Sequence, residues 1–195
     1  EANLQDFRGL TLWTSELSSG GGWHNEPHSI NLRQSDFSFS TWKGFDISKS
    51  IITDSRFEGA ELIGDIRFYS TKIENCLFEN CLFKNVNFTK SSLINVSFFG
   101  LRPRDKFSFS ADRIERCRFE GEMKGVNFSA SPLKESAFAG TLTDCTFLGN
   151  LTIITLDKAR EIYGRLEAEN VANRMQSVDF EAANLIRCNF SNYCY

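Results

Sequence analysis

The chain has 195 residues, 25 acidic and 22 basic side chains, and a formal net charge of −3. That length can bury one good-sized core, and the near balance of charge argues against a strongly polyanionic or polycationic protein. No apolar run approaches the ~20 residues needed to cross a membrane, and no signal peptide is visible, so we expect a soluble protein.

Residues 1–30 are predicted to form an irregular N-terminal cap with a glycine-rich loop. The loop, at about 20–28, contains Trp23, both histidines of the chain and one glutamate. Two His and one Glu could in principle hold a metal, but their spacing matches no helix-borne zinc motif, and the neighbouring Gly and Pro are typical of a loop. We therefore expect no metal, and we take Trp23 as a candidate aromatic contact.

Large apolar residues recur at every fifth position across residues 31–147, and 14 of the 19 phenylalanines in the chain lie on this register when Phe180 and Phe190 of the final coil are included. The series comprises Leu32, Phe37, Trp42, Ile47, Ile52, Phe57 and Leu62, then every fifth residue from Phe68 to Phe98, then Phe109, Ile114, Phe119, Met123, Phe128, Leu133, Phe138, Leu142 and Phe147. A period of five fits neither a helix nor a strand, so it describes a unit that turns a corner every five residues. The residue two positions earlier is usually small, which would let large and small side chains fill a narrow interior.

Four such units would make one coil, so equivalent residues should recur at about 20. This spacing predicts three ladders: Phe37, Phe57, Phe78, Phe98, Phe119 and Phe138; Ile47, Phe68, Phe88, Phe109, Phe128 and Phe147; and Leu32, Ile52, Ile73, Leu93, Ile114 and Leu133. It also predicts that Gly121 and Gly140 lie at the same corner of successive coils. A stack of this kind is stabilised mainly by contacts between neighbouring coils.

The repeat loses one large centre between residues 99 and 106. We expect a short loop to bulge out there and to present Arg102, Arg104, Asp105 and Lys106 as candidate protein contacts, the alternative being a simply solvated loop. Further arginines follow, but interspersed acidic residues dilute the basic patch and argue against nucleic acid as the partner.

Residues 148–179 interrupt the repeat, which resumes in a final coil at 180–195. Leu156, Ala159, Ile162, Tyr163 and Leu166 recur at helical spacing, so an amphipathic helix is predicted, and Val171 and Met175 could extend it. The helix could pack on the repeat or dock onto a further domain or a partner. Its candidate contact residues are Lys158, Arg160 and Arg165.

Five of the six cysteines occupy the small inward position of the repeat: Cys76, Cys81, Cys117, Cys145 and Cys188. A thiol there behaves as a compact hydrophobic group, so we interpret these residues as structural and expect a reducing compartment. Cys194 is off the register and is the best candidate for an exposed thiol. No residue pattern suggests catalysis, a metal or a cofactor.

This pattern resembles the pentapeptide-repeat family, in which units of Ala-Asp/Asn-Leu-x-x recur with Phe as a common alternative to Leu. Matching stretches begin at Ala2, Ala60 and Ala183. The resemblance implies an all-β solenoid, a right-handed quadrilateral β-helix of pentapeptide repeats, here with one helical insertion near the C-terminus.

The architecture also resembles the N-terminal β-helix of secreted bacterial HECT-like ubiquitin ligases of the SopA/NleL group. The absence of an initial Met and the position of Tyr195 at a coil centre favour a domain of a larger protein. The resemblance implies a non-catalytic, host-target-binding scaffold with host ubiquitination components as partners, secretion into the host cytoplasm, and a catalytic cysteine in a separate lobe.

An alternative function is that of the DNA-mimicking quinolone-resistance pentapeptide proteins, which protect topoisomerases such as gyrase. Mimicry requires a strongly anionic surface, since duplex DNA carries one charge per ~1.7 Å of its axis. The net charge of −3 offers little support, and a continuous negative stripe along the solenoid would favour this alternative.

Overall fold

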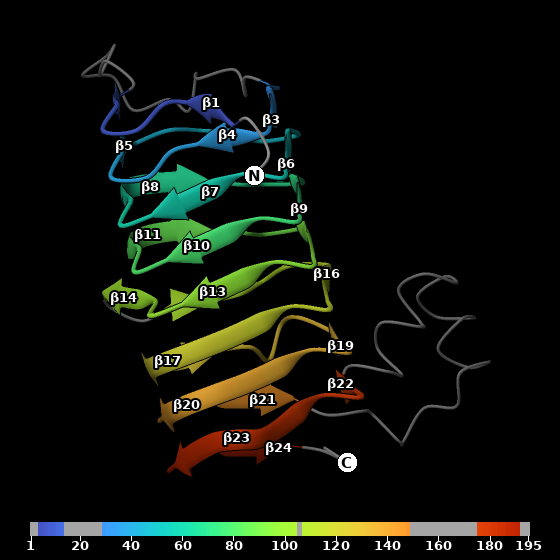
Figure 1. Ribbon diagram of the computed structural model, residues 1–195. Helices are drawn as coiled ribbons and strands as arrows, with labels where there is room; N and C mark the ends of the chain where they lie inside the picture. Colours follow the sequence, from blue (N-terminus) through green and yellow to red (C-terminus); the bar gives the residue numbers. More distant parts are fainter. Residues whose placement is uncertain (1–3, 14–28, 105–106, 149–174, 192–195) are drawn as a thin grey trace, which may run out of the picture.

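The computed structural model describes residues 4–13, 29–104, 107–148 and 175–191. Within these ranges the chain forms 24 short strands and no helix, and the strands pair only in parallel, so the molecule is an all-β parallel solenoid (Figure 1). None of the described residues forms a helix that could span a membrane.

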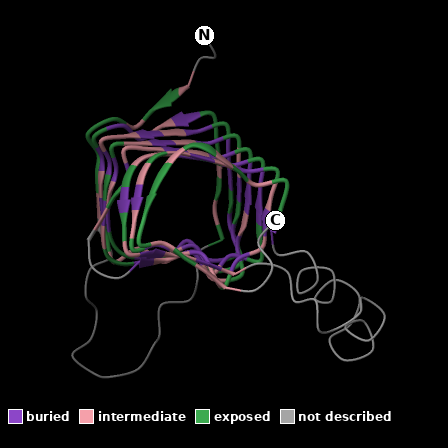
Figure 2. Ribbon diagram, turned by 90° about the horizontal axis from the view of Figure 1, so that it is seen from below, coloured by how far each residue is buried: buried purple, intermediate pink, exposed green. Residues whose placement is uncertain are grey.

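The strands lie in four sheets, which form the sides of a square when the stack is viewed along its axis (Figure 2). Sheet A contains β1 (Gln5–Asp6), β4 (Ser35–Asp36), β7 (Arg56–Glu58), β10 (Leu77–Glu79), β13 (Ser97–Phe99), β17 (Arg118–Lys124), β20 (Ala137–Thr143) and β23 (Asp179–Ile186). Sheet B contains β2 (Thr11–Trp13), β5 (Thr41–Lys43), β8 (Glu61–Arg67), β11 (Leu82–Asn87) and β14 (Arg102–Arg104). Sheet C contains β3 (Asn31–Arg33), β6 (Ile51–Thr53), β9 (Lys72–Glu74), β12 (Ser92–Ile94), β16 (Arg113–Glu115), β19 (Leu133–Lys134) and β22 (Met175–Gln176). Sheet D contains β15 (Phe107–Ser108), β18 (Val126–Asn127), β21 (Thr146–Leu148) and β24 (Asn189–Ser191).

The predicted ladders are confirmed. Phe57, Phe78, Phe98 and Phe119 are in register on sheet A and stack with ring centroids 4.6 to 5.2 Å apart. Similar stacks run along the side of sheet D, and the aliphatic ladder pairs along sheet C. These side chains have almost no exposure to solvent, so they form one continuous core along the axis.

The last three coils turn from sheet A onto the next side of the square without a break in the strand. Gly121 pairs with Gly140 at this corner, as predicted, and Gly140 pairs in turn with Ala183. Beyond the corner, Met123 pairs with Leu142 and continues the wall that sheet B forms in the earlier coils. We call this whole side of the square the B face.

The prediction of a bulging loop at residues 99–106 is wrong for residues 102–104. Arg102–Arg104 form β14, which pairs in register with β11, and Pro103 lies at the centre position opposite Phe83. The interior left by this small side chain is filled by Leu101 and Phe107, which are 3% and 5% exposed. The chain therefore keeps its backbone course because two neighbouring side chains take over the missing volume. Asp105 and Lys106 lie outside the described residues.

The stack begins earlier than residue 31, because β1 and β2 extend sheets A and B, and Phe7 stacks on Phe37 at 5.0 Å. Near the other end, Met175 lies in β22 and pairs with Leu133, so it continues the aliphatic ladder rather than a helix. Of the insertion predicted at 148–179, residues 149–174 lie outside the described part of the chain, whereas Leu148 lies in β21 and Asp179 in β23.

Candidate binding surfaces

Charge is distributed unevenly between neighbouring sides of the solenoid. The part of sheet A that precedes the corner at Gly121 and Gly140 carries seven acidic and two basic residues. The acidic residues are Asp6, Asp36, Glu58, Glu79, Glu120, Asp179 and Glu181, and the basic ones are Arg56 and Arg118. Glu58 and Glu79 lie side by side in register, at the ~4.8 Å spacing of adjacent strands, so sheet A presents a predominantly negative surface.

Each arginine of sheet A is paired with a glutamate of its own strand. Arg56 pairs with Glu58 and lies 3.9 Å from Glu79, and Arg118 pairs with Glu120 at 3.0 Å. The two partners flank a buried centre and therefore point outward together. All of these side chains are about one-third or more exposed, so each pair contributes little to stability and mainly sets the local charge.

Sheet C carries one tighter charge cluster. The Glu115 side chain is only 6% exposed and pairs with both Arg113 and Arg116. The hydrogen bond from Arg113 lowers the pKa of Glu115 against the opposing effect of burial. This cluster has a structural explanation, because a buried carboxylate requires such partners.

The B face has the opposite charge from sheet A. Among the residues whose side chains are described, its outward positions hold four basic and two acidic residues: Lys43, Lys84, Arg102 and Lys124, with Glu61 and Glu122. Lys84 and Lys124 are exposed, and no ion pair to either is found among the described residues.

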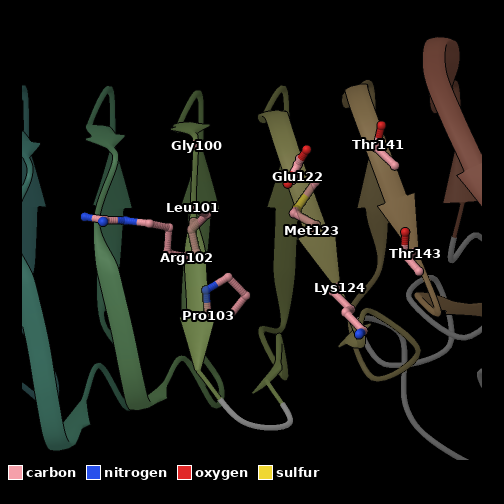
Figure 3. Close-up of a pocket in the computed structure, with 9 residues that line it drawn as sticks. All are labelled: Gly100, Leu101, Arg102, Pro103, Glu122, Met123, Lys124, Thr141 and Thr143. Atoms are coloured by element: carbon pink, nitrogen blue, oxygen red, sulfur yellow. The ribbon is translucent and has the colours of Figure 1, made fainter.

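The B face also contains a pocket of about 560 Å³, between β14 and the outer half of β17 (Figure 3). Gly100, Leu101, Arg102 and Pro103 line one side of it, and Glu122, Met123, Lys124, Thr141 and Thr143 line the other. The pocket lies where one large centre of the repeat is missing. The missing centre is visible in the sequence, but from the sequence alone it predicts a loop rather than a pocket.

The candidate contact residues from the sequence are only partly described. Arg102 is exposed on β14, where its guanidinium donates to the carbonyl oxygen of Asn80 at 2.7 Å, and Figure 3 shows the side chain extending away from β17. Arg104 is the last residue of β14. The remaining candidates, Trp23, Asp105, Lys106, Lys158, Arg160 and Arg165, lie outside the described residues. Of the eight candidates, the structure therefore describes only Arg102 and Arg104, which lie on the same strand.

The cysteines that the structure describes support the structural interpretation. Cys76, Cys81, Cys117 and Cys145 are buried and unpaired by disulfides, and Cys188 is half-buried. Burial raises the pKa of Cys76 and Cys81 to about 12 and that of Cys117 and Cys145 to about 11, which makes them poor nucleophiles at neutral pH. Cys194 is outside the described residues, among which no group of His, Cys, Asp and Glu could hold a metal ion.

No protein-family model matches the chain, and neither does any curated protein. Among solved structures, the chain is similar to a trypsin-treated variant of QnrB1, a plasmid-mediated fluoroquinolone resistance protein. The two share 12% identity with a TM-score of 0.38, over 85% of this chain and 91% of that chain. The chain is also similar to HetL, a pentapeptide repeat protein involved in heterocyst differentiation regulation from the cyanobacterium Nostoc, with 14% identity and a TM-score of 0.28 over 96% of this chain and 90% of that chain. At these TM-scores the likeness carries no argument about function.

Proposed function

We propose that this chain is a non-catalytic scaffold that binds a protein partner through the outer surface of sheet A. The observation that carries the proposal is the segregation of charge, with seven acidic and two basic residues on sheet A beside the basic B face. A flat sheet held by a continuous core presents these carboxylates in fixed positions, which suits recognition of a complementary surface. The partner that fits is a protein with a basic face.

Affinity capture tests this proposal. The wild-type chain and the variant Glu58→Lys/Glu79→Lys would serve as baits in bacterial and host-cell lysates, with mass spectrometry as the readout. Glu61→Lys/Glu74→Lys makes the same change of charge on the other sides of the solenoid and serves as the matched control. We expect a specific set of proteins with basic surfaces that is lost only with the sheet A variant, and equal capture by all three baits would contradict the proposal.

Two finer hypotheses concern the identity of the partner. The hypothesis of a host-target-binding domain of a HECT-like ubiquitin ligase rests on the architecture inferred from sequence. The alternative, topoisomerase protection by DNA mimicry, requires an anionic surface, and the acidic sheet A supplies one. We therefore put the alternative ahead of the ligase hypothesis.

The density of charge limits the mimicry hypothesis. The eight strands of sheet A extend over roughly 34 Å at the ~4.8 Å strand spacing, where duplex DNA would carry about 20 phosphates. Seven carboxylates supply about a third of that charge, and three of them, Asp6, Glu58 and Glu120, are paired with an arginine. Supercoiling by purified gyrase in the presence of a fluoroquinolone distinguishes the hypotheses: rescue of supercoiling by the wild-type chain but not by Glu58→Lys/Glu79→Lys supports mimicry, and no rescue excludes it.

A further inference from the structure

The B face is interrupted between two neighbouring coils. Sheet B ends at β14, whose hydrogen-bonded neighbour is β11, and within the described residues no ladder joins β14 to β17. The coils are joined on both sides of this interruption, by the hydrogen bond from Gly100 N–H to Glu120 O at 2.8 Å and by the pairing of Phe107 with Val126. The interruption is therefore an opening in one side of the solenoid, bounded at both ends by paired backbone.

Pro103 provides the physical reason. At other centre positions, the backbone N–H donates to the residue that precedes the centre of the next coil: Phe37 to Arg56 O, Phe68 to Asn87 O, and Phe128 to Thr146 O, each at 2.8 Å. By the same rule, residue 103 would donate to the carbonyl of Glu122. Proline has no N–H, so this bond cannot form.

The opening leaves backbone groups of both strands without a strand partner. In an intact parallel ladder, the N–H groups of Glu122 and Lys124 would donate to the carbonyls of Leu101 and Pro103. Among the described residues the N–H of Glu122 does not donate to Leu101, and the carbonyl of Glu122 receives no bond from Pro103, so one donor and two carbonyls border the 560 Å³ pocket. Alternating donors and acceptors of this kind are what an extended peptide pairs with.

The side chains around the opening select the chemistry of that peptide. Lys124 lies on the β17 side of the pocket and Arg102, which extends away from β17, on the other, both exposed, and Glu122 is the single acidic residue of the lining. The floor is apolar, formed by Leu101, Pro103 and Met123 (Figure 3). The size of the pocket is within the usual range for ligand sites.

From this geometry we propose that the opening beside Pro103 is a second binding site, which takes an extended segment of a partner protein with acidic side chains. The backbone of the segment pairs with Glu122, an apolar side chain lies on Met123 and Pro103, and a carboxylate of the segment faces Lys124. The site is on the B face, so it does not depend on the binding surface proposed for sheet A.

Fluorescence anisotropy tests this site with a short labelled peptide in which Glu alternates with Val, titrated with the whole chain. A peptide in which Lys replaces Glu, and a labelled single-stranded oligonucleotide, serve as comparison probes. We expect saturable binding of the Glu peptide and not of the Lys peptide. Equal or tighter binding of the oligonucleotide would show that charge alone is recognised and would overturn the proposal, as would no saturable binding of the Glu peptide.

Three variants locate the site. Pro103→Ala restores the missing N–H, so β14 can pair with β17 and close the opening; we expect peptide affinity to fall about tenfold with no loss of thermal stability. Lys124→Glu should weaken binding by a similar factor, whereas Lys72→Glu, the same charge change on sheet C, should not. Binding by Pro103→Ala as tight as that of the wild type would overturn the proposal.

Hydrogen exchange of the free chain provides an independent test of the opening. The amide of Glu122 should exchange fast in the wild type, and slowly in Pro103→Ala or in the peptide complex. A protected Glu122 amide in the free wild type would overturn the proposal whether or not the peptide binds.

Discussion

Where the residue two positions before a buried centre is Ser, Thr or Cys, it acts both as a spacer and as a hydrogen-bond donor. Ser131 Oγ donates to Phe109 O at 2.5 Å, Thr71 Oγ1 to Ile47 O at 2.6 Å, and Cys76 Sγ to Ile52 O at 3.6 Å. In each case the acceptor belongs to the preceding coil. A small polar side chain therefore leaves room for the large centre and ties two coils together, which explains why Ser, Thr and Cys interchange at this position.

The buried thiols give the protein a specific alkaline sensitivity. An unfolded cysteine ionises near pH 8.5, whereas burial raises the pKa of Cys76 and Cys81 to about 12. Above about pH 9 the unfolded chain loses protons that the folded chain keeps, so the free energy of unfolding should fall by up to about 1.4 kcal/mol per pH unit for each thiol. Below pH 8 these thiols should have no effect on the pH dependence.

Urea denaturation between pH 7 and pH 11 measures this effect in the wild type and in Cys76→Ser/Cys81→Ser. Serine occupies the equivalent position in other units, so the variant should keep most of its stability at pH 7 and show a shallower loss above pH 9. The same alkaline slope in both proteins would mean that these thiols are not protected in the folded state.

At the scale of the element, the corners decide which backbone positions must be glycine. At Gly140, φ is +87°, and an added Cβ would lie 2.5 Å from the carbonyl oxygen of Gly121 and 2.9 Å from its nitrogen. At Gly125 φ is +66°, but no atom lies within 4 Å of the corresponding Cβ. The two glycines share the left-handed conformation and differ in the space around them.

We therefore expect Gly140→Ala to cost about 2–5 kcal/mol, from the conformational strain together with displacement of the backbone of the neighbouring coil. Gly125→Ala should cost only the strain, about 1–2 kcal/mol. Thermal or urea denaturation of the two variants checks the difference, and equal losses would show that the corner of Gly121 and Gly140 is not closely packed.

The strands show why the sequence predicts some elements and not others. The ladders were predictable because a repeated large residue can be buried only by turning inward in every coil. The opening at Pro103 was not predictable, because a missing large centre indicates a loop. That Leu101 and Phe107 fill the missing volume is evident only from their burial in the structure. The absence of an N–H at Pro103 was visible in the sequence, but its effect depends on the register of β14 against β11.

At the scale of the whole molecule, a nearly neutral composition conceals two faces of opposite charge. The net charge of −3 offered little support for an anionic surface, yet the coil spacing of about 20 residues places Glu58 and Glu79 side by side on sheet A, and Lys84 and Lys124 on the B face. Net charge could not reveal this arrangement, because it depends on which side of each centre a charge lies and on the exact length of each coil. Most of the contact residues proposed from the irregular segments lie outside the part of the chain that the structure describes.

Carbodiimide labelling of carboxylates, with and without a partner obtained by affinity capture, tests the central claim most directly. Mass spectrometry would follow Glu58, Glu79 and Glu120 on sheet A, with Glu61 on sheet B and Glu74 on sheet C as internal controls. The account predicts that bound partner reduces labelling of the three sheet A glutamates and leaves the two controls unchanged. Unchanged labelling on sheet A, or protection confined to Glu61 or Glu74, would contradict binding through sheet A.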